Sequence, residues 1–259
     1  MANHIPADRQ KRIAELIRER GVVRVNDLSM QFQVSVLTIR RDLDLLEEQG
    51  VLERSHGGAV LRQTMPEEPM FAQKEQRFRE QKHRIAAATA RFIHDGDMVL
   101  INSGTTTLEV IRQIIHKRIT IITNNIAAAQ LIDTASCDMI ILGGKFRCQS
   151  QSTAGSFGLQ SLQQIYANKA VIGVDGFSMK YGLTTPIMQE AEITRVMIEK
   201  TVGDVLVVAD SNKMGVISNF KTVSVEKISH LVTDSAAKEF LTEIELEKAG
   251  IKLILADSH

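Results

Sequence analysis

The sequence predicts an α/β protein in which an N-terminal winged helix-turn-helix domain precedes a Rossmann-like, mostly parallel α/β domain. Two patterns carry this prediction. Residues 1–62 show three helical stretches followed by a hairpin around glycines, which is the element order of a winged helix-turn-helix. Residues 81–259 alternate short apolar runs with helical patterns, which is typical of a parallel sheet covered by helices on both faces.

Composition limits the classes of function that the chain can have. Its 259 residues include 31 Lys and Arg and 31 Asp and Glu, so the net charge is zero. A protein that coats nucleic acid without specificity is basic, so DNA binding here must depend on where individual charges lie. Cys137 and Cys148 are too few for a disulfide framework and suit a reducing cytoplasm. Because the sequence has neither a long apolar run nor a signal-peptide pattern, we expect a cytoplasmic protein that does not span a membrane.

The N-terminal part of the chain predicts two helices. Asp8 can cap a helix that runs to about Arg20, where Gly21 ends it. After a short extended stretch, a second helix is expected from about Asn26 to Phe32. Apolar residues at helical spacing give both helices a face that can be buried.

A third helix is expected to begin after Ser35, a good N-cap, and to end near Gly50. Ile39, Leu43 and Leu46 fall at positions i, i+4 and i+7, which predicts a buried stripe. At about 100° per residue, the two arginines after Ile39 lie on the opposite side. The N-terminal residues of such a helix can enter a major groove and contact guanine edges, phosphates or a thymine methyl group. The DNA-binding candidates on this helix are Ser35, Val36, Leu37, Thr38, Arg40 and Arg41.

A hairpin is expected next, with strands over 51–54 and 59–62. Its turn contains His56 and Gly57, which together with Arg54 are candidates for contact with phosphates or the minor groove. A winged helix that only contacts other proteins would leave the arginines on a solvated face. The complete order of elements favours DNA binding over that alternative.

Residues 63–80 are expected to form a linker between the two domains. Two prolines and two glutamates within seven residues break regular structure and favour a stiff, solvated connector. From about Phe71 the pattern becomes helical and charged and continues through Lys82 and Arg84. We interpret this run of charges as the solvated face of a helix.

The second domain, residues 81–259, is expected to contain seven strands joined by helices. The strands are predicted over 98–102, 119–123, 139–142, 170–174, 205–209, 231–233 and 252–255. The helices are predicted over about 106–116, 126–134, 157–166, 188–202 and 236–249. Ligands of open parallel sheets bind beyond the C-terminal ends of the strands, so the residues that follow each strand are the candidates for a site.

Five of these strand ends carry small, polar or charged residues. Residues 103–107, Ser-Gly-Thr-Thr-Thr, lead into a helix whose N-terminus favours an anion, so they form a candidate phosphate cradle. Helix capping would explain this loop taken alone. Lys145 and Lys213 can pair with an anion, and Asp175 can accept a hydroxyl group, so the set favours a sugar phosphate. The effector-binding candidates are Ser103, Gly104, Thr105, Thr106, Thr107, Asn124, Gly143, Gly144, Lys145, Asp175, Glu190 and Lys213.

Residues 35–43 and 50–59 resemble the N-terminal domain of DeoR-type transcriptional regulators. Stretches at the predicted strand ends are similar to the sensor domain of the same family. These stretches are 102–107, 123–125, 142–147, 182–185, 189–192 and 209–213. The resemblance covers nearly the whole chain and implies a helix-turn-helix at about 23–42. It also implies a sensor similar in fold to ribose-5-phosphate isomerase that responds to phosphorylated sugars or related metabolites.

The resemblance further implies roles for individual residues. Residues 103–107 would hold the phosphate, and Asp175 and Lys213 would lie in the pocket. Asn102 departs from the family pattern, because many relatives carry an acid at this position. Because Asn102 is uncharged, the negative charge that such relatives have beside the cradle is missing at this position. The pattern of ligand hydroxyl groups that is recognised can differ as a result.

A sugar-phosphate isomerase with an accessory winged domain is the alternative from another class of protein. Such an enzyme needs a carboxylate base, which Glu190 or Glu192 could supply. The acid-rich loop of the isomerase is only half present, because no second acid follows Asp175 directly. We therefore predict a protein that is not an enzyme. The histidines are scattered, so we also predict no metal and no cofactor.

Together these patterns predict a transcriptional repressor of a carbohydrate-utilisation operon. Its partners would be double-stranded operator DNA and a phosphorylated sugar or related metabolite that releases the protein from the operator. An activator of the same class is a second alternative. A single winged domain makes few contacts with DNA, so a homodimer or homotetramer is expected.

Overall fold

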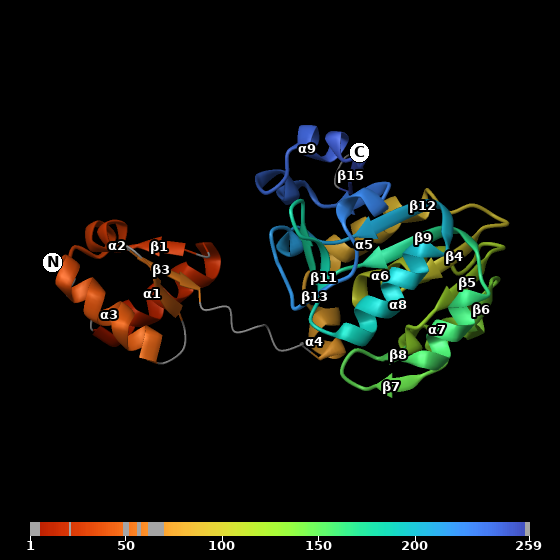
Figure 1. Cartoon of the computed structure of the whole chain (residues 1–259), viewed down its shortest axis with the longest axis horizontal. Helices are drawn as coiled ribbons and strands as arrows, with labels where there is room; N and C mark the ends of the chain where they lie inside the picture. The colour runs from red at the N-terminus through yellow and green to blue at the C-terminus, as the bar shows by residue number, and fades with distance from the viewer. Residues whose placement is uncertain (1–5, 21, 49–51, 56–57, 62–69, 257–259) are drawn as a thin grey trace. The chain divides into compact units, whose positions relative to one another are not determined.

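The computed structural model describes residues 6–20, 22–48, 52–55, 58–61 and 70–256. The chain divides into two compact units, Met1–Thr64 and Met65–His259 (Figure 1). The first unit is a winged helix-turn-helix, and the second is an α/β unit built around a seven-stranded sheet. The predicted fold class is therefore confirmed.

The first unit combines three helices with a three-stranded antiparallel sheet of order β1-β3-β2. Its elements are α1 (Pro6–Arg20), β1 (Val22–Arg24), α2 (Val25–Phe32), α3 (Val36–Glu48), β2 (Leu52–Ser55) and β3 (Gly58–Leu61). The extended stretch expected between the first two helices is β1, which pairs with β3 of the hairpin. Gln33 adopts a left-handed conformation with φ of 53° and ends α2, which sets the turn into α3.

The core of the first unit lies between its helices and its sheet. The predicted stripe of α3, Ile39, Leu43 and Leu46, is buried and belongs to the same apolar cluster as Ile13 and Ile17 of α1. One face of α3 is thereby committed to the core. The opposite face is left for solvent or for a partner.

The second unit is organised around a sheet of seven strands in the order β15-β14-β12-β9-β4-β5-β6. Every neighbouring pair in this sheet is parallel. The strands are β4 (Met98–Ile101), β5 (Thr120–Thr123), β6 (Asp138–Ile141), β9 (Ala167–Gly173), β12 (Thr201–Val208), β14 (His230–Thr233) and β15 (Lys252–Leu255). All seven predicted strands are present.

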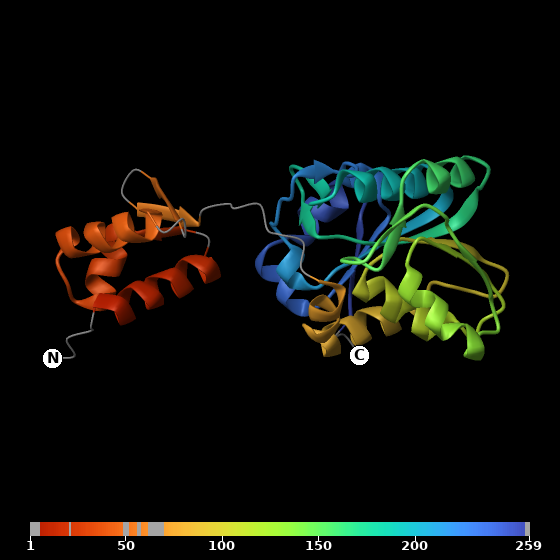
Figure 2. The ribbon, with the colours of Figure 1, turned by 90° about the horizontal axis from the view of Figure 1, so that it is seen from below.

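Helices cover both faces of this sheet (Figure 2). They include α5 (Arg79–Ala90), α6 (Thr105–Ile114), α7 (Ser156–Gln163) and α8 (Met188–Glu199). Strand β4 shows the division, because Val99 and Ile101 belong to the apolar cluster that contains α5 and α6. Leu100, between them, belongs to the cluster that contains α7 and α8. Alternate residues of one strand therefore contribute to two cores, as expected for a sheet buried on both faces.

Two of the predicted helices differ from the structure. The stretch Ile126–Thr134 forms a 3₁₀ helix, η1. The helix expected over 236–249 is divided into a 3₁₀ helix, η4 (Ser235–Glu239), and α9 (Glu243–Lys248). The division has a local cause, because Thr242 and Glu245 form a capping box that starts a new helix at Glu243.

Two small β-structures above the C-terminal strand ends were not predicted. One is the hairpin β7 (Lys145–Arg147) and β8 (Ser152–Ala154). The other is the antiparallel sheet β10 (Gly176–Ser178), β11 (Gly182–Thr185) and β13 (Phe220–Lys221). Strands of two to four residues are too short to show the alternation on which a sequence-based prediction depends.

A short helix, α4 (Phe71–Gln76), belongs to the second unit. The ring of Phe71 is buried in the cluster that contains α5 and α6, and the Phe71 N–H donates to the carbonyl of Gln149 at 2.8 Å. Two further 3₁₀ turns, η2 (Ser211–Lys213) and η3 (Val225–Lys227), follow β12. Across the described ranges, we find no helix with the length and apolarity needed to cross a membrane.

Candidate functional sites

Helix α3 exposes the side that the sequence predicts for DNA. Ser35, Val36, Leu37, Arg40 and Arg41 are exposed, and the exposed fraction of Leu37 reaches 59%. Thr38 is half-buried, and its N–H donates to the Ser35 hydroxyl oxygen at 3.1 Å. Ser35 is therefore the N-cap of α3, as predicted. The exposed N-terminal half of the helix has the composition that phosphates and base edges require.

A buried ion pair fixes α3 against α1. Arg9 Nε donates to Asp42 Oδ2 at 2.6 Å, and Arg9 Nη2 donates to Asp42 Oδ1 at 3.2 Å. Gln10 Nε2 adds a third hydrogen bond to Asp42 Oδ1 at 2.9 Å. The acid in the sequence Arg40-Arg41-Asp42 is therefore a structural anchor inside the unit. It contributes nothing to the charge of the surface that would meet DNA.

The predicted DNA-binding residues of the wing are Arg54, His56 and Gly57. His56, Gly57 and the side chain of Arg54 lie outside the described residues, while the backbone of Arg54 belongs to β2. Their predicted contacts with DNA stay predictions.

The second unit contains a cavity of about 320 Å³ beyond the C-terminal ends of its strands. Its wall combines the loop after β4, the ends of β9 and β12, strand β11 and the corner between α4 and α5. The cavity brings together most of the predicted effector residues, namely Ser103, Gly104, Thr105, Thr106, Thr107, Asp175, Glu190 and Lys213.

The loop before α6 presents backbone donors to this cavity. Gly104 is the N-cap of α6 and has φ of 146°, a conformation that a side chain would strain. The first N–H groups of α6 have no acceptor within the helix, so they are available to an anion. The Thr107 hydroxyl donates to the Asn102 carbonyl at 2.8 Å. This hydroxyl therefore holds the loop, and Ser103, Thr105 and Thr106 also line the cavity.

Asn124 lies behind the cradle and does not line the cavity. Its Oδ1 accepts the Ser103 N–H at 2.8 Å, and its Nδ2 donates to the Thr153 carbonyl at 2.9 Å. The neighbouring Asn125 donates to the Gly104 carbonyl at 3.0 Å. Both asparagines therefore hold the loop through hydrogen bonds.

The predicted residues Gly143, Gly144 and Lys145 also stand away from the cavity lining. They lead into the β7–β8 hairpin, and Lys145 is exposed. A Cβ on Gly144 would lie 2.5 Å from the Ala154 carbonyl oxygen, and φ of Gly144 is 145°. Close pairing of the hairpin explains the glycine without a ligand.

Asn102 joins the ends of the two central strands. Its Oδ1 accepts the Gly173 N–H at 2.8 Å, and its Nδ2 donates to the Gly173 carbonyl at 2.9 Å and to Thr194 Oγ1 at 3.2 Å. An amide is needed for this arrangement, because a carboxylate could accept the N–H but could not donate to the carbonyl. The departure noted in the sequence therefore has a structural explanation.

Asp175 carries a negative charge within the cavity wall. Its Oδ1 accepts from Lys74 Nζ at 2.8 Å, and its Oδ2 accepts from the Thr185 hydroxyl at 3.0 Å. Burial alone would raise the pKa of Asp175, but Lys74, Lys213 and the Thr185 hydrogen bond together hold that pKa below its usual value. The carboxylate is ionised and can accept a ligand hydroxyl group.

Lys82 is the deepest cation of the wall, with an exposed fraction of 6%. Its Nζ donates to the Arg77 carbonyl at 2.7 Å and also to the Lys74 carbonyl. Burial lowers the pKa of Lys82 to about 8, although Asp210 acts in the opposite direction. The interpretation of this charged run as a solvated helix face is therefore wrong for Lys82, because the start of α5 faces the cavity.

Glu190 supplies a second carboxylate on another side. It lies in the first turn of α8, and its Oε1 accepts from Arg147 Nε at 3.2 Å and from the Ser152 hydroxyl at 3.0 Å. These contacts attach the β7–β8 hairpin to the rim of the cavity. With Asp175, Glu190 gives the cavity two hydroxyl acceptors to complement its cations and helix N-terminus.

Comparison with known proteins decides between the classes considered above. The family model described as "DeoR C terminal sensor domain" matches residues 77–235, and that described as "DeoR-like helix-turn-helix domain" matches residues 9–65. The chain belongs to the DeoR family of transcriptional regulators. The residues matched to the sensor domain include the parts of the cavity wall that come from α5, the loop after β4 and the strand ends.

Curated DeoR-type relatives match over almost their full length. The HTH-type transcriptional regulator GlpR of Haloferax volcanii is 33% identical and covers 96% of this chain and 98% of its own. The transcriptional repressor AccR of Agrobacterium fabrum is 32% identical (96% and 97%), and the HTH-type transcriptional repressor GlcR of Bacillus subtilis is 28% identical (95% and 94%). The prediction of a transcriptional regulator, and not an enzyme, is confirmed.

Solved structures show more distant likeness to this DeoR-family chain. The translation initiation factor eIF-2B of Pyrococcus horikoshii aligns with a TM-score of 0.44 at 14% identity, covering 89% of this chain and 82% of that one. Ribose 5 phosphate isomerase A of Neisseria gonorrhoeae aligns with a TM-score of 0.37 at 12% identity, covering 54% and 53%. The chain thus spans about half of the isomerase.

The sequence carries no signal for the part of the cavity wall that comes from α4 and the start of α5. Lys74, Arg77, Phe78 and Lys82 all line the cavity. Their pattern along the chain is that of an ordinary charged helix. Only the tertiary contact of Lys74 with Asp175, 101 residues later, identifies them as part of a site.

Proposed function

We propose that this DeoR-family regulator is a repressor of a carbohydrate-utilisation operon and that a phosphorylated sugar, or a related metabolite, releases it from its operator. The observation that carries the proposal is the composition of one cavity. The helix N-terminus at residues 103–107, the cations Lys213 and Lys82, and the carboxylates Asp175 and Glu190 all line it. Anion donors and hydroxyl acceptors in one wall match a ligand that is both phosphorylated and hydroxylated.

The ligand would be small. A volume of about 320 Å³ is at the lower end of small-molecule pockets, which span roughly 300–1,000 Å³, and suits a monosaccharide phosphate. In this assignment, the phosphate binds the backbone N–H groups at the start of α6 together with Lys213. Asp175 and Glu190 accept hydroxyl groups of the sugar. The acids disfavour a ligand that is anionic along its whole length.

The DNA-binding half of the proposal rests on α3. Arg40 and Arg41 are exposed beside a buried stripe, and Leu37 and Ser35 precede them on the first turn. Arginine binds guanine bidentately in the major groove, and serine and threonine can bind phosphates. The domain limits 1–62, 63–80 and 81–259 stay predictions.

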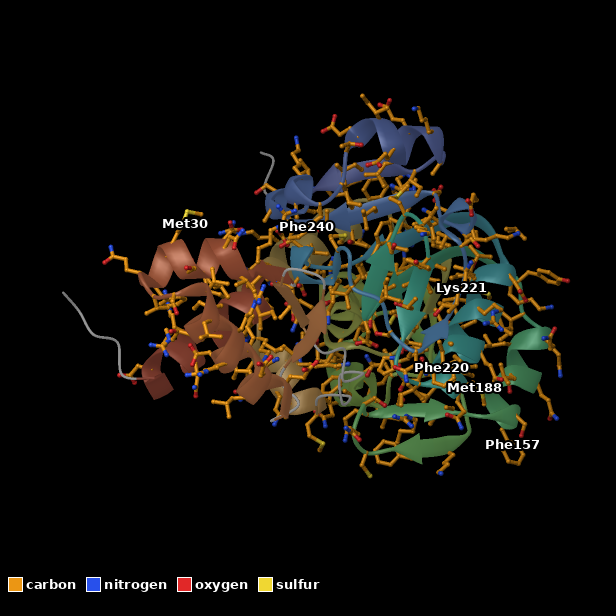
Figure 3. All side chains as sticks on the ribbon, turned by 60° about the vertical axis from the view of Figure 1, so that its left-hand side comes forward. Met30, Phe157, Met188, Phe220, Lys221 and Phe240 are labelled. Atoms are coloured by element: carbon orange, nitrogen blue, oxygen red, sulfur yellow. The ribbon has the colours of Figure 1, made fainter. Side chains whose placement is uncertain are left out.

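We also propose that the regulator acts as a homodimer or homotetramer on repeated half-sites. The second unit exposes large apolar side chains that could contribute to such an assembly. Two of them, labelled in Figure 3, are Phe157 of α7 and Met188 of α8, with exposed fractions of 73% and 49%. Helices α7 and α8 contact each other, so the two side chains lie on neighbouring helices.

The experiment begins with an operator and a ligand panel. Operator DNA is selected from random duplexes with the full-length protein, and thermal-shift assays compare sugar phosphates with their unphosphorylated parents. A ligand at 100 times its dissociation constant adds about 2.7 kcal/mol of stability. Fluorescence anisotropy should then show that the active sugar phosphate weakens operator binding roughly 5- to 150-fold. Operator binding that no sugar phosphate changes would overturn the effector assignment, and reporter expression in a deletion strain separates repressor from activator.

A further inference from the structure

Helix α4 is the first element of the second unit in the described chain, and it follows residues 62–69, which connect the two units in sequence. Contacts with several other elements hold it in place. The Phe71 N–H donates to the Gln149 carbonyl, Lys74 pairs with Asp175, and Glu75 pairs with Arg112 of α6 at 3.1 Å. A conformational change in the second unit that is transmitted along the chain to the first unit must therefore pass through α4.

One of these interactions lies in the wall of the effector cavity. Lys74 and Asp175 both line the cavity, and their Nζ and Oδ1 atoms are 2.8 Å apart. The pair is half-buried. It joins α4 to the end of the central strand β9, so it is a direct electrostatic link between α4 and the cavity.

A second cavity residue supports the far end of the same helix. Lys82 donates to the carbonyls of Lys74 and Arg77, which end α4. A cation that faces the cavity therefore also closes the corner between α4 and α5. Two cations that a bound anion would attract therefore hold α4: Lys74 through its pair with Asp175, and Lys82 through its bonds to the carbonyls at the end of the helix.

We propose that Lys74 is the residue through which this regulator senses its ligand: a bound phosphorylated ligand takes the Lys74 ammonium from Asp175 and loosens α4. The inference rests on the proposed function, because it needs an anion in this cavity. A phosphate carries more charge than the carboxylate, and Asp175 keeps the hydrogen bond from the Thr185 hydroxyl when Lys74 leaves. The two states differ in a contact that the ligand changes, as a ligand-driven shift requires.

Hydrogen–deuterium exchange of the full-length protein tests this with inorganic phosphate as the probe. Two regions give separate readouts: amides of residues 103–107 report binding, and amides of residues 71–77 report the state of α4. In the wild type, phosphate should slow exchange at 103–107 and accelerate exchange at 71–77 by roughly fivefold or more. Lys74→Met should show the fast α4 exchange without phosphate, and phosphate should not increase it further.

Two further variants complete the design. Asp175→Asn removes the same pair from the other side and should reproduce fast α4 exchange even if Lys74→Met folds poorly. Lys238→Met, at an exposed lysine paired with Glu243, should behave as the wild type. Slowed exchange at 103–107 with unchanged α4 would overturn this inference alone. Unchanged exchange in both regions of the wild type would overturn the proposed phosphate site and this inference with it. Slow α4 exchange in both Lys74→Met and Asp175→Asn would overturn the role of the pair.

Discussion

The side-chain amide of Asn102 bonds to both polar groups of Gly173, accepting from its N–H at 2.8 Å and donating to its carbonyl at 2.9 Å. This contact joins the ends of β4 and β9. The loop 103–107 begins one residue after Asn102, and Asp175 lies two residues after Gly173. One buried amide therefore ties the loop 103–107 to the strand end that carries Asp175.

Asn102→Asp should destabilise the second unit by about 1–3 kcal/mol, because one carboxylate oxygen would face the Gly173 carbonyl without a proton between them. The loss should shrink at low pH, where a protonated carboxyl group can donate. Denaturant unfolding at pH 7 and pH 5 measures both effects. Asn219→Asp, at an exposed position, is the matched control, and equal stability of the two variants at pH 7 would contradict the role of the amide.

Asp42→Asn should unfold or strongly destabilise the first unit. Breaking a buried ion pair by removing one charge costs about 3–5 kcal/mol, and a unit of this size has little stability to lose. Calorimetry should show the transition of the first unit lowered or absent, while the transition of the second unit stays in place as an internal control. The double variant Arg9→Met, Asp42→Leu should recover much of the loss, because no buried charge remains unpaired. An unchanged first transition in Asp42→Asn would show that the pair does not anchor α3.

Arg41→Ala and Arg40→Ala should each weaken binding to the selected operator while leaving the fold intact, because both side chains are exposed. Removing an arginine that binds a guanine edge costs about 1–3 kcal/mol and relaxes the sequence preference at that base pair. Removing an arginine that binds a phosphate instead weakens all sequences alike and lowers the salt dependence. Anisotropy titrations with operator and scrambled duplexes distinguish the two. Arg12→Ala, at an exposed arginine of α1, is the control. Full operator affinity in both Arg40→Ala and Arg41→Ala would show that α3 does not contact the DNA bases.

Sugar-phosphate binding should be tightest between about pH 6 and pH 8. A phosphate monoester becomes dianionic above its second pKa of about 6, and Lys82 loses its charge as the pH rises through its pKa of about 8. The charged groups around Lys82 are Asp210, Lys213, Glu75 and Lys74. Isothermal titration at a series of pH values measures the profile. Lys82→Met should lose the decline above pH 8, and a wild-type affinity that stays constant to pH 9 would show that Lys82 does not contact the ligand.

The same group makes the stability of the second unit depend on pH. The pKa of Lys82 is about 8 in the folded protein and 10.5 as its reference value in the unfolded chain. Between these values the unfolded chain binds more protons than the folded one, so stability should rise with pH in this window. Denaturant unfolding across this window measures the slope, and Lys82→Met should abolish the rise.

The sequence predicts what repeats locally. The stripe Ile39, Leu43 and Leu46 and the seven apolar strands follow from spacing alone, because burial on one or both faces imposes a period. The loop 103–107 could also be found, since a glycine and three threonines before a helix are a local pattern.

The contacts that complete the sites depend on distant residues and could not be found in this way. Asn102 finds its partner 71 residues later, and Lys74 finds Asp175 after 101. Neither pair has a local signature, because an asparagine after a strand and a lysine on a helix are common. Arg9 and Asp42 are equally inconspicuous in sequence, although their bond decides how α3 is held.

The order of the strands has a consequence for synthesis on the ribosome. Strand β4 pairs with the central strand β9, which ends at Gly173, whereas the first unit ends at Thr64. The difference, 173 − 64, is 109 residues, which takes roughly 5–20 seconds to translate at about 5–20 residues per second. During that interval a nascent chain can carry a folded DNA-binding unit without the central strand pair of its sensor. A newly made molecule can therefore complete its helix-turn-helix unit before the central strands of its second unit have paired.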